Sequence, residues 1–386
     1  MDEIDNRTYW LIAIFAFVGI GGAMIQVRGA LIPTFEEVFT VSKGQLGLVT
    51  SIGTVGYVTA MFWLGPASGR IDLQRFLLIG GGLSVVGLVA IGLAPTFLVL
   101  LAMIGLRSFG IGVFRALDRP TLSHLYPNSR ARIFNLQEMA WAVGATAGPL
   151  LVAAVLLQFS WRLTYFVLAA LSVPVLVLIW RLDPPAGTVN EQSFGLDDVR
   201  TVLSHPSVYG MVIAIVLVGS LESTFFTWLP SYADEMFSRG IASVTLSLYL
   251  VAYIPGRLAF SRLAERFRIT GLLTVVSAVL TVLLYVAYVH ADGIALLVLI
   301  FAVGSLVSGL FPTLVSLGIE SNPAYTGPVN AIANIATQIG FFTAPVTLGV
   351  VADGSSVQQA MLLQVGMAGV LAVILFGLRL GPVEDA

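Results

Sequence analysis

The chain has 386 residues, of which 57% are hydrophobic and only 10% charged, with a formal net charge of −2. Soluble domains carry about 25% charged residues, and a mean hydropathy of +0.94 leaves more apolar surface than a water-soluble fold of this size could bury. The charge argues against a nucleic-acid partner. The absence of cysteine excludes disulfides, thiolate nucleophiles and cysteine metal sites.

Apolar segments of membrane-spanning length follow one another along the chain. A helix needs about 20 mainly apolar residues to cross a hydrocarbon core about 30 Å thick, and a helix satisfies its own backbone hydrogen bonds there. The first segment has no small-residue cleavage site, so we expect it to be retained as a span. The sequence predicts an all-α membrane protein with twelve spans near residues 9–33, 45–66, 76–94, 97–125, 132–157, 162–181, 206–231, 243–260, 270–289, 293–318, 327–350 and 359–380.

The longest polar interval runs from Asp183 to His205 and contains two prolines. Proline and clustered polar residues are typical of loops. Because this interval separates six spans from six, we expect a linker at 182–205 between an N-terminal bundle, 1–181, and a C-terminal bundle, 206–386.

The basic residues are distributed unequally over the two sides of the predicted membrane. Of the 19, thirteen fall on one side, three lie inside spans, and three fall on the other side: Lys43, Arg162 and Arg239. Basic residues favour the cytoplasmic side. The bias predicts a multi-pass protein of the cell inner (plasma) membrane with both termini and the linker in the cytoplasm.

A short basic motif recurs at the same place in each half. After the second span come Gly69, Arg70, Asp72 and Arg75, and after the eighth come Gly256, Arg257, Glu265 and Arg266. Arg107 with Gly110 and Gly112, and the run from Gly144 to Pro149, form further motifs. Together these residues resemble the major facilitator superfamily. The resemblance implies two pseudo-symmetric six-helix bundles and solute transport by alternating access.

A local similarity to the fucose permease group lies in Phe311-Pro312-Thr313 and in the run from Arg132 to Leu136. That group takes up a neutral sugar with a proton. The positions where its members carry acidic residues in spans 1 and 4 fall near Gly29 and Arg115, and neither is acidic. The sugar and proton sites of the group therefore do not transfer to this chain.

The repeated motif has a mechanical and a topological interpretation. The resemblance implies that Asp72 meets helix ends and arginines of the opposite half and holds a gate closed, together with Gly69, Arg70, Arg75, Arg257, Glu265 and Arg266. Alternatively, the arginines of the motif only fix the orientation of the chain in the membrane.

Five charged residues lie inside predicted spans: Arg28, Arg107, Arg115, Glu138 and Glu222. Such charges are costly in a membrane and are candidate functional residues. Arg28, Arg107 and Arg115 are candidates to bind an anion, because a guanidinium fits a carboxylate or phosphate in bidentate fashion. The alternatives are a structural Arg107 bonded to carbonyl groups, and an Arg115 paired with Glu138 or Asp118.

Proton coupling needs a group that titrates as its surroundings change between wet and dry. The three histidines lie away from the middle of the predicted spans. Glu222 and Glu138 are therefore the candidates for proton coupling, since burial and a nearby arginine act on a carboxyl group in opposite directions. A static hydrogen bond or ion pair is the alternative for each.

Polar residues Asn330, Asn334 and Gln338 recur every four residues and share one helix face. They are candidates to bind solute hydroxyl groups, and Trp228 is a candidate to stack on a sugar. Helix packing is the alternative for both sets.

The sequence contains no phosphate-binding loop, nucleophile elbow or metal-ligand cluster, so an enzyme is not expected. We expect a monomeric secondary transporter of a small polar solute, without a cofactor, whose partners are the lipid bilayer and a proton or another coupling ion. An organic anion is the favoured solute class. Neutral sugar uptake by symport, efflux by antiport and a non-transporting receptor remain alternatives.

The predicted topology can be tested because the chain has no cysteine of its own. A single cysteine introduced at Gln192, in the predicted linker, should react with a membrane-impermeant reagent only after the cells are opened. Labelling of intact cells from outside would contradict the cytoplasmic linker.

Overall fold

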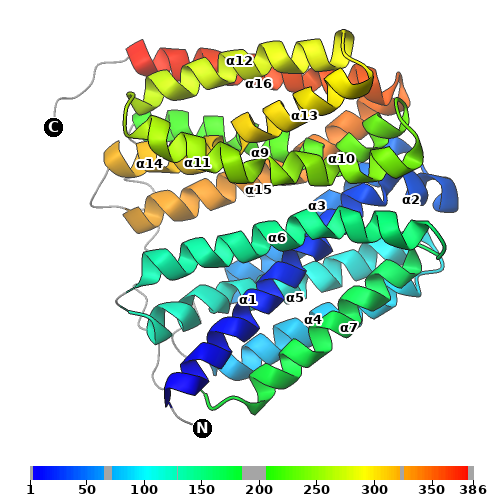
Figure 1. Cartoon of the computed structure of the whole chain (residues 1–386), viewed down its shortest axis with the longest axis vertical. Helices are drawn as coiled ribbons and strands as arrows, with labels where there is room; N and C mark the ends of the chain where they lie inside the picture. The colour runs from blue at the N-terminus through cyan, green and yellow to red at the C-terminus, as the bar shows by residue number, and fades with distance from the viewer. Residues whose placement is uncertain (1–2, 65–71, 128, 185–205, 322–325, 381–386) are drawn as a thin grey trace. The chain divides into compact units, whose positions relative to one another are not determined.

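The computed structural model describes residues 3–64, 72–127, 129–184, 206–321 and 326–380. Over these residues the chain contains no strand, and twelve helical segments are long and apolar enough to cross a membrane, which confirms the predicted all-α membrane fold (Figure 1). The helices are α1 (Glu3–Ala30), α2 (Ile32–Phe39), α3 (Lys43–Leu64), α4 (Leu73–Gly92), α5 (Phe97–Leu125), α6 (Arg130–Leu156), α7 (Arg162–Arg181), α9 (Pro206–Asp234), α10 (Arg239–Val251), α11 (Tyr253–Ala264), α12 (Ile269–Val289), α13 (Gly293–Val307), α14 (Leu310–Ser321), α15 (Thr326–Asp353) and α16 (Val357–Leu380).

Contacts divide the chain into two compact units. Unit 1 comprises Met1–Val41 and Leu48–Ser193, and unit 2 comprises Ser42–Gly47 and Phe194–Ala386. The predicted linker, 182–205, lies outside the described residues from residue 185 onward. The bundle boundaries predicted from the sequence stay a prediction.

In unit 1, α1 packs along α6 and α4 along α5, while α7 contacts both α1 and α4. Glycine allows these helices to approach closely. A Cβ atom at Gly144 of α6 would overlap the carbonyl oxygen of Gly19 in α1, and a Cβ atom at Gly148 would lie 2.8 Å from the carbonyl oxygen of Ala23. The small residues in the Gly144 to Pro149 run therefore act in packing α6 onto α1.

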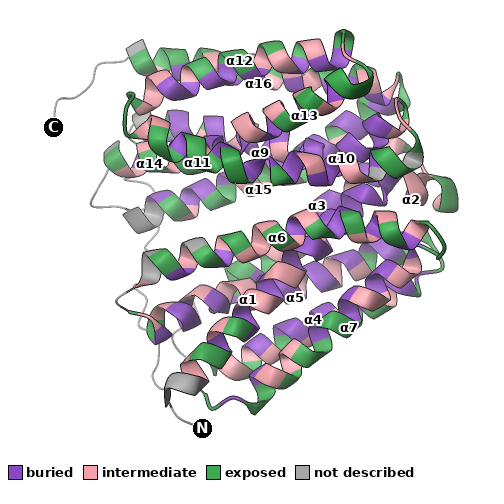
Figure 2. Ribbon diagram, in the orientation of Figure 1, coloured by how far each residue is buried: buried purple, intermediate pink, exposed green. Residues whose placement is uncertain are grey.

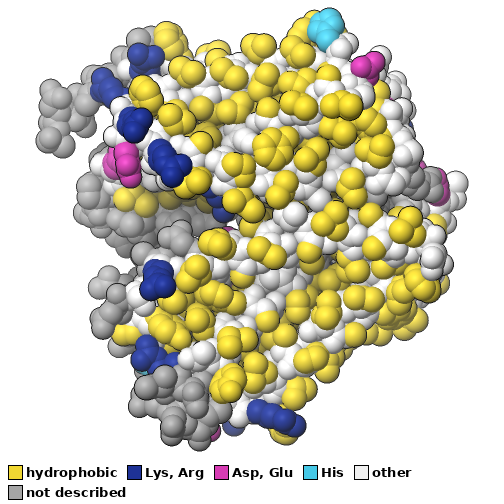
Figure 3. Space-filling model, viewed as in Figure 1, with side chains coloured by type: hydrophobic (Ala, Val, Ile, Leu, Met, Phe, Trp, Pro, Cys, Tyr) yellow, Lys and Arg dark blue, Asp and Glu magenta, His cyan; other side chains and the backbone are white. Residues whose placement is uncertain are grey.

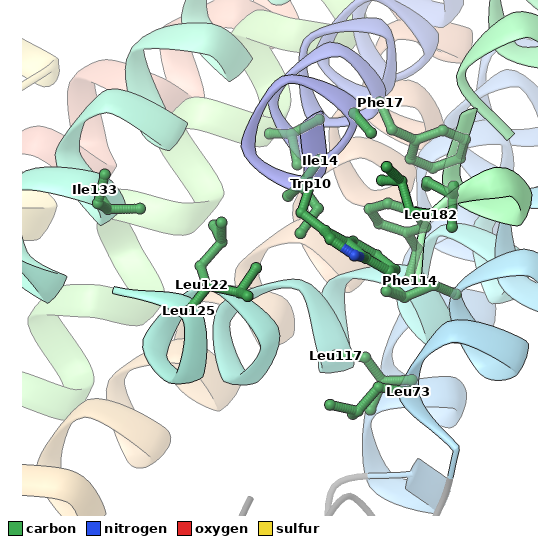
Figure 4. Close-up of a cluster of buried hydrophobic side chains, with 14 residues drawn as sticks. Trp10, Ile14, Phe17, Leu73, Phe114, Leu117, Leu122, Leu125, Ile133 and Leu182 are labelled. Atoms are coloured by element: carbon green, nitrogen blue, oxygen red, sulfur yellow. The ribbon is translucent and has the colours of Figure 1, made fainter. Parts of the chain in front are cut away.

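An apolar cluster fills one end of unit 1 (Figure 4). Phe17 of α1 stacks on Phe114 of α5 with ring centroids 4.0 Å apart. Trp10 is fully buried, and its indole N–H donates a 3.0 Å hydrogen bond to the carbonyl of Asp183, just beyond α7. The cluster thus joins α1, α5 and α7. Its other labelled members are Ile14, Leu73, Leu117, Leu122, Leu125, Ile133 and Leu182.

In unit 2, α9 lies between α15 and α16 and also contacts α10 and α14, so it is the most buried of the candidate spans (Figure 2). Helix α12 runs along α16. A polar relay crosses this packing: Gln364 donates a 2.5 Å hydrogen bond to the hydroxyl of Thr224 and accepts one from Tyr288. Fully bonded polar groups of this kind hold membrane helices together.

Two predicted spans are each broken into two helices. Helix α10 ends at Val251, four residues before Pro255, and α13 ends just before Ser308, four residues before Pro312. Because proline has no backbone N–H, it cannot donate to the carbonyl four residues earlier, and its ring crowds that carbonyl. The breaks between α10 and α11 and between α13 and α14 follow from these prolines.

Large apolar side chains are exposed along the helices of both units. Hydrophobic groups cover most of the face in Figure 3, and few charged groups are seen among them. Such an apolar surface is far larger than a soluble monomer presents. We therefore assign it to lipid contact; examples are Ile12, Leu98, Trp180, Val282 and Val373.

The first turn of α3 belongs to unit 2, where it meets the end of α15. The backbone N–H groups of Lys43 and Gly44 donate to the two carboxylate oxygens of Asp353 at 2.6 and 2.9 Å. A carboxylate at a helix N-terminus satisfies free N–H groups and interacts favourably with the helix dipole. Asp353 thus caps a helix that lies more than 300 residues away in sequence.

Replacing Gly144 with alanine should destabilise unit 1, because the added methyl group would overlap the backbone of Gly19. Overpacking of this kind costs about 1–3 kcal/mol. Gly21→Ala, where a Cβ atom would meet nothing within 4 Å, is the matched control. Thermal unfolding of the purified proteins in detergent should show a lower Tm for Gly144→Ala only; equal Tm values would contradict close α1–α6 packing.

Candidate functional site

Two of the predicted anion-binding residues, Arg28 and Arg107, come together in unit 1. Arg28 lies in the last turn of α1 and Arg107 in the middle of α5, and both side chains are buried. Arg107 bonds to the carbonyl of Met24, one turn before Arg28 on α1, and the two guanidiniums lie within electrostatic range of Tyr165 in α7. We call these three residues the arginine pair site.

The guanidinium groups of the arginine pair site bond to neutral oxygens. Arg28 donates from Nε to the carbonyl of Ile25 at 3.1 Å and from Nη1 to that of Val49 at 3.4 Å. Arg107 donates from Nη1 to the carbonyl of Met24 at 3.1 Å and from Nη2 to the Ser108 hydroxyl at 2.8 Å. Within the described part of the chain, neither guanidinium forms an ion pair with a carboxylate.

Two polar atoms of this site are buried without a partner among the described residues, namely Arg107 Nε and the Tyr165 hydroxyl. Leaving such groups unpaired is costly. Space around Arg28 is tight, because a Cβ atom at Gly53 of α3 would overlap its Nη1. Glycine at position 53 therefore lets the guanidinium lie against α3.

Arg115 occupies a different part of α5 and has carboxylate partners. It bonds Asp118 at 2.9 Å, within its own helix, and Glu138 of α6 at 3.1 Å. Arg119 adds a second bond to Glu138 at 2.7 Å, and Gln137 donates to Asp118 at 2.8 Å. Arg115 and Glu138 thus form the ion pair that the sequence left open as an alternative, and Asp118 shares it.

Glu222 of α9 is half-buried in unit 2 and faces aromatic hydroxyls. The Tyr253 hydroxyl donates to its carboxylate at 2.9 Å, and the hydroxyls of Tyr253 and Tyr249 lie 3.1 Å apart. Arg257 interacts with Glu222 electrostatically, and its guanidinium carbon lies 5.6 Å from the ring centre of Tyr253. A carboxyl group in a short chain of hydroxyls is suited to exchanging a proton.

The other predicted solute-binding residues lie in unit 2 and are not gathered around one point. Trp228 is fully buried, and its indole N–H donates to the carbonyl of Pro345 at 3.0 Å, so both its ring and its polar atom are used in packing. On α15, Asn334 is exposed and donates to the backbone of Asn330 at 2.8 Å. Gln338 lies one turn further along the same helix and is half-buried.

The predicted gating residues are only partly visible, since Gly69 and Arg70 lie outside the described residues. Asp72 caps α4, because its carboxylate accepts a hydrogen bond from the backbone N–H of Arg75 at 3.1 Å. The same carboxylate forms an ion pair with the Arg75 side chain at 2.9 Å.

In the second copy of the motif, Arg257, Glu265 and Arg266 are exposed, and none of the three forms an ion pair with another described residue. Gating by either copy stays a prediction.

Comparison with known proteins identifies the family. The family model of the Major Facilitator Superfamily matches residues 9–345. The chain belongs to the Major Facilitator Superfamily. It is a multi-pass membrane transporter of a small solute, and its relatives are transporters and not enzymes.

Individual relatives are distant but match over most of their length. The protein is 22% identical to a Protein TsgA homolog of Erwinia tasmaniensis, over 94% of this chain and 92% of the relative. The solved structure of the nucleoside transporter NupG is 17% identical, with a TM-score of 0.82 over 98% of this chain and 100% of that one. A solved structure of the E. coli fucose:proton symporter FucP is 19% identical, with a TM-score of 0.63 over 95% of this chain and 98% of that one. At these identities the solved structures show the shared superfamily fold.

Sequence reasoning did not select several residues of these clusters. Tyr165 gives no signal, because a tyrosine in an apolar helix is usually a packing residue. Tyr249 and Tyr253 are four residues apart, a spacing that places them on one helix face and could have marked them. Asp118 is named from the sequence, but only as an alternative partner of Arg115, because a spacing of three residues is typical of a pair within a helix.

Proposed function

We propose that this superfamily transporter carries a small organic anion, a carboxylate, sugar acid or phosphate ester, and binds its negative charge at Arg28 and Arg107. The observation that carries the proposal is a pair of neighbouring buried guanidiniums without a carboxylate partner in the described residues. Carbonyl dipoles solvate a guanidinium but do not cancel its charge, and two like charges repel. An anion held between them would remove both costs.

The bonding pattern leaves donors for such an anion. Arg28 uses Nε and Nη1 for backbone carbonyls, which leaves Nη2, and Arg107 uses both terminal nitrogens, which leaves Nε. The unpaired hydroxyl of Tyr165 is a third donor. Convergent donors with full positive charge recognise carboxylate and phosphate oxygens. Arg115 is not part of the proposed site, because its charge is paired with Glu138.

Substitution of Arg28 separates an anionic from a neutral solute. Arg28→Lys keeps the charge but loses the planar fork, so affinity for a bidentate anion should fall by about tenfold or more, about 1.4 kcal/mol. Arg28→Gln should lose nearly all binding of an anion. A neutral sugar would retain much of its affinity for Arg28→Gln, since an amide also bonds hydroxyl groups.

The measurement begins with a thermal-shift screen of carboxylates, sugar acids, sugar phosphates and neutral sugars on the purified protein. Titration calorimetry of the strongest stabilising compound follows, on both Arg28 variants and on Arg379→Gln, a control in an exposed position near the end of α16. Near-normal anion affinity in Arg28→Gln with a normal Tm would assign Arg28 to helix packing and refute the proposal.

We further propose that transport is coupled to protons and that Glu222 carries the proton. The support is its half-buried carboxyl group within hydrogen-bond reach of Tyr253, in electrostatic range of Arg257. Movement that changes either contact would change the proton affinity of the carboxyl group. For Glu138, the bonds to Arg115 and Arg119 favour a structural ion pair over a proton carrier.

Glu222→Gln should abolish accumulation of solute against a gradient while exchange of internal for external solute continues in part. Exchange requires no net proton release, whereas accumulation does. Proteoliposomes with an imposed pH gradient provide the measurement, and Glu320→Gln, an exposed residue of α14, is the control. Unchanged pH-driven accumulation in Glu222→Gln would show that the proton binds elsewhere.

A further inference from the structure

The strongest unexplained feature outside the proposed anion site is the bond between Asp118 of α5 and Gln137 of α6. Both side chains are fully buried. Gln137 Nε2 donates to Asp118 Oδ2 at 2.8 Å, and Arg115 Nη1 contacts the same oxygen at 2.9 Å. The other oxygen of each residue, Asp118 Oδ1 and Gln137 Oε1, is buried without a partner among the described residues.

The two unpartnered atoms are both acceptors when Asp118 is ionised, and no donor among the described residues then serves either of them. A single proton on Oδ1 changes this, because a carboxylic acid has one donor and one acceptor, as does the edge of an amide. The acid O–H would donate to Gln137 Oε1 while Gln137 Nε2 donates to Oδ2. This cyclic acid–amide pair satisfies the buried oxygens of both groups.

Arg115 and Arg119 lie near Asp118 and their charges favour its ionised form, but both arginines have another carboxylate partner. Arg115 and Arg119 both bond to Oε1 of Glu138, which gives them one carboxylate in common. The side chain of Arg119 is 40% exposed, so solvent screens much of its charge, although its Nε is buried without a partner among the described residues. The remaining titratable neighbour is Tyr57 of α3, which interacts electrostatically with Arg115. If Asp118 is neutral, Arg115 and Arg119 therefore still share Glu138 as a carboxylate partner.

We propose that Asp118 is a proton-binding residue that holds its proton against Gln137 in the described conformation. The site lies in unit 1, whereas Glu222 lies in unit 2, so it is a separate proton site and does not rest on the proposed solute or on Glu222. A helix movement that separates α5 from α6 at this point would remove the amide acceptor and expose the acid to water. The proton would then leave and Asp118 would become a second partner for Arg115.

The test uses amide variants of the two acidic residues in the cluster. Asn is shaped like a protonated Asp and can make the same pair of bonds with Gln137, so Asp118→Asn should keep its Tm within about 2 °C of the unchanged protein. Glu138→Gln removes the only carboxylate that the described residues would leave to Arg115 and Arg119, so its Tm should fall further. If Asp118 were ionised, Asp118→Asn would break a fully buried ion pair and would be the more destabilising change.

Infrared spectroscopy of the purified protein observes the proton directly. A protonated carboxyl group has a carbonyl stretch that is separate from those of carboxylates and amides and shifts in heavy water. This band should lose intensity in Asp118→Asn, whereas in Glu222→Gln the Asp118 component should persist. An unchanged acid band in Asp118→Asn, a Tm below that of Glu138→Gln, or a failure of Asp118→Asn to fold would each overturn the proposal. Those results would indicate an ionised Asp118 whose free oxygen binds a buried water molecule.

Discussion

The cost of holding an ionised side chain inside an apolar bundle shapes the polar structure of this protein. Helix α5 shows two ways of compensating a buried arginine within three turns. Arg115 is compensated by the carboxylate of Glu138, while Arg107 is solvated by a carbonyl and a hydroxyl that are only partial charges. The first arrangement is complete in itself. The second leaves positive charge without a carboxylate partner among the described residues, as the anion site that we propose requires.

Close backbone packing makes these charged positions possible. A Cβ atom at Gly87 of α4 would lie 2.7 Å from Cβ of Arg107, and one at Gly53 of α3 would overlap Arg28. Glycine at position 53 lets Arg28 lie so near α3 that the carbonyl of Val49, one turn earlier, is within reach of its guanidinium. The same glycines that allow helix packing therefore also position Arg28 and Arg107.

The sequence predicted the spans and the residues that are costly to bury, because both depend on local composition. It could not predict which charges meet. Arg28, Arg107 and Arg115 are equivalent as residue types, yet only the tertiary packing of α1, α5 and α6 gives Arg115 its partner Glu138 and leaves the other two without a carboxylate among the described residues. Pro255 predicts the end of α10, because proline breaks a helix. A hydropathy average over a whole span does not show the effect of one proline.

The two carboxyl groups that we assign to protons differ in the chemistry of their partners. Glu222 receives a hydrogen bond from a phenol, a donor that stabilises a carboxylate more than an acid. Asp118 faces an amide whose oxygen lacks a donor among the described residues, an arrangement that stabilises the acid. The two hydrogen-bond partners thus act on their acids in opposite directions, although both acids are at least half-buried. One carboxyl group can then hold a proton while the other is ionised, although the two side chains have similar intrinsic acidity.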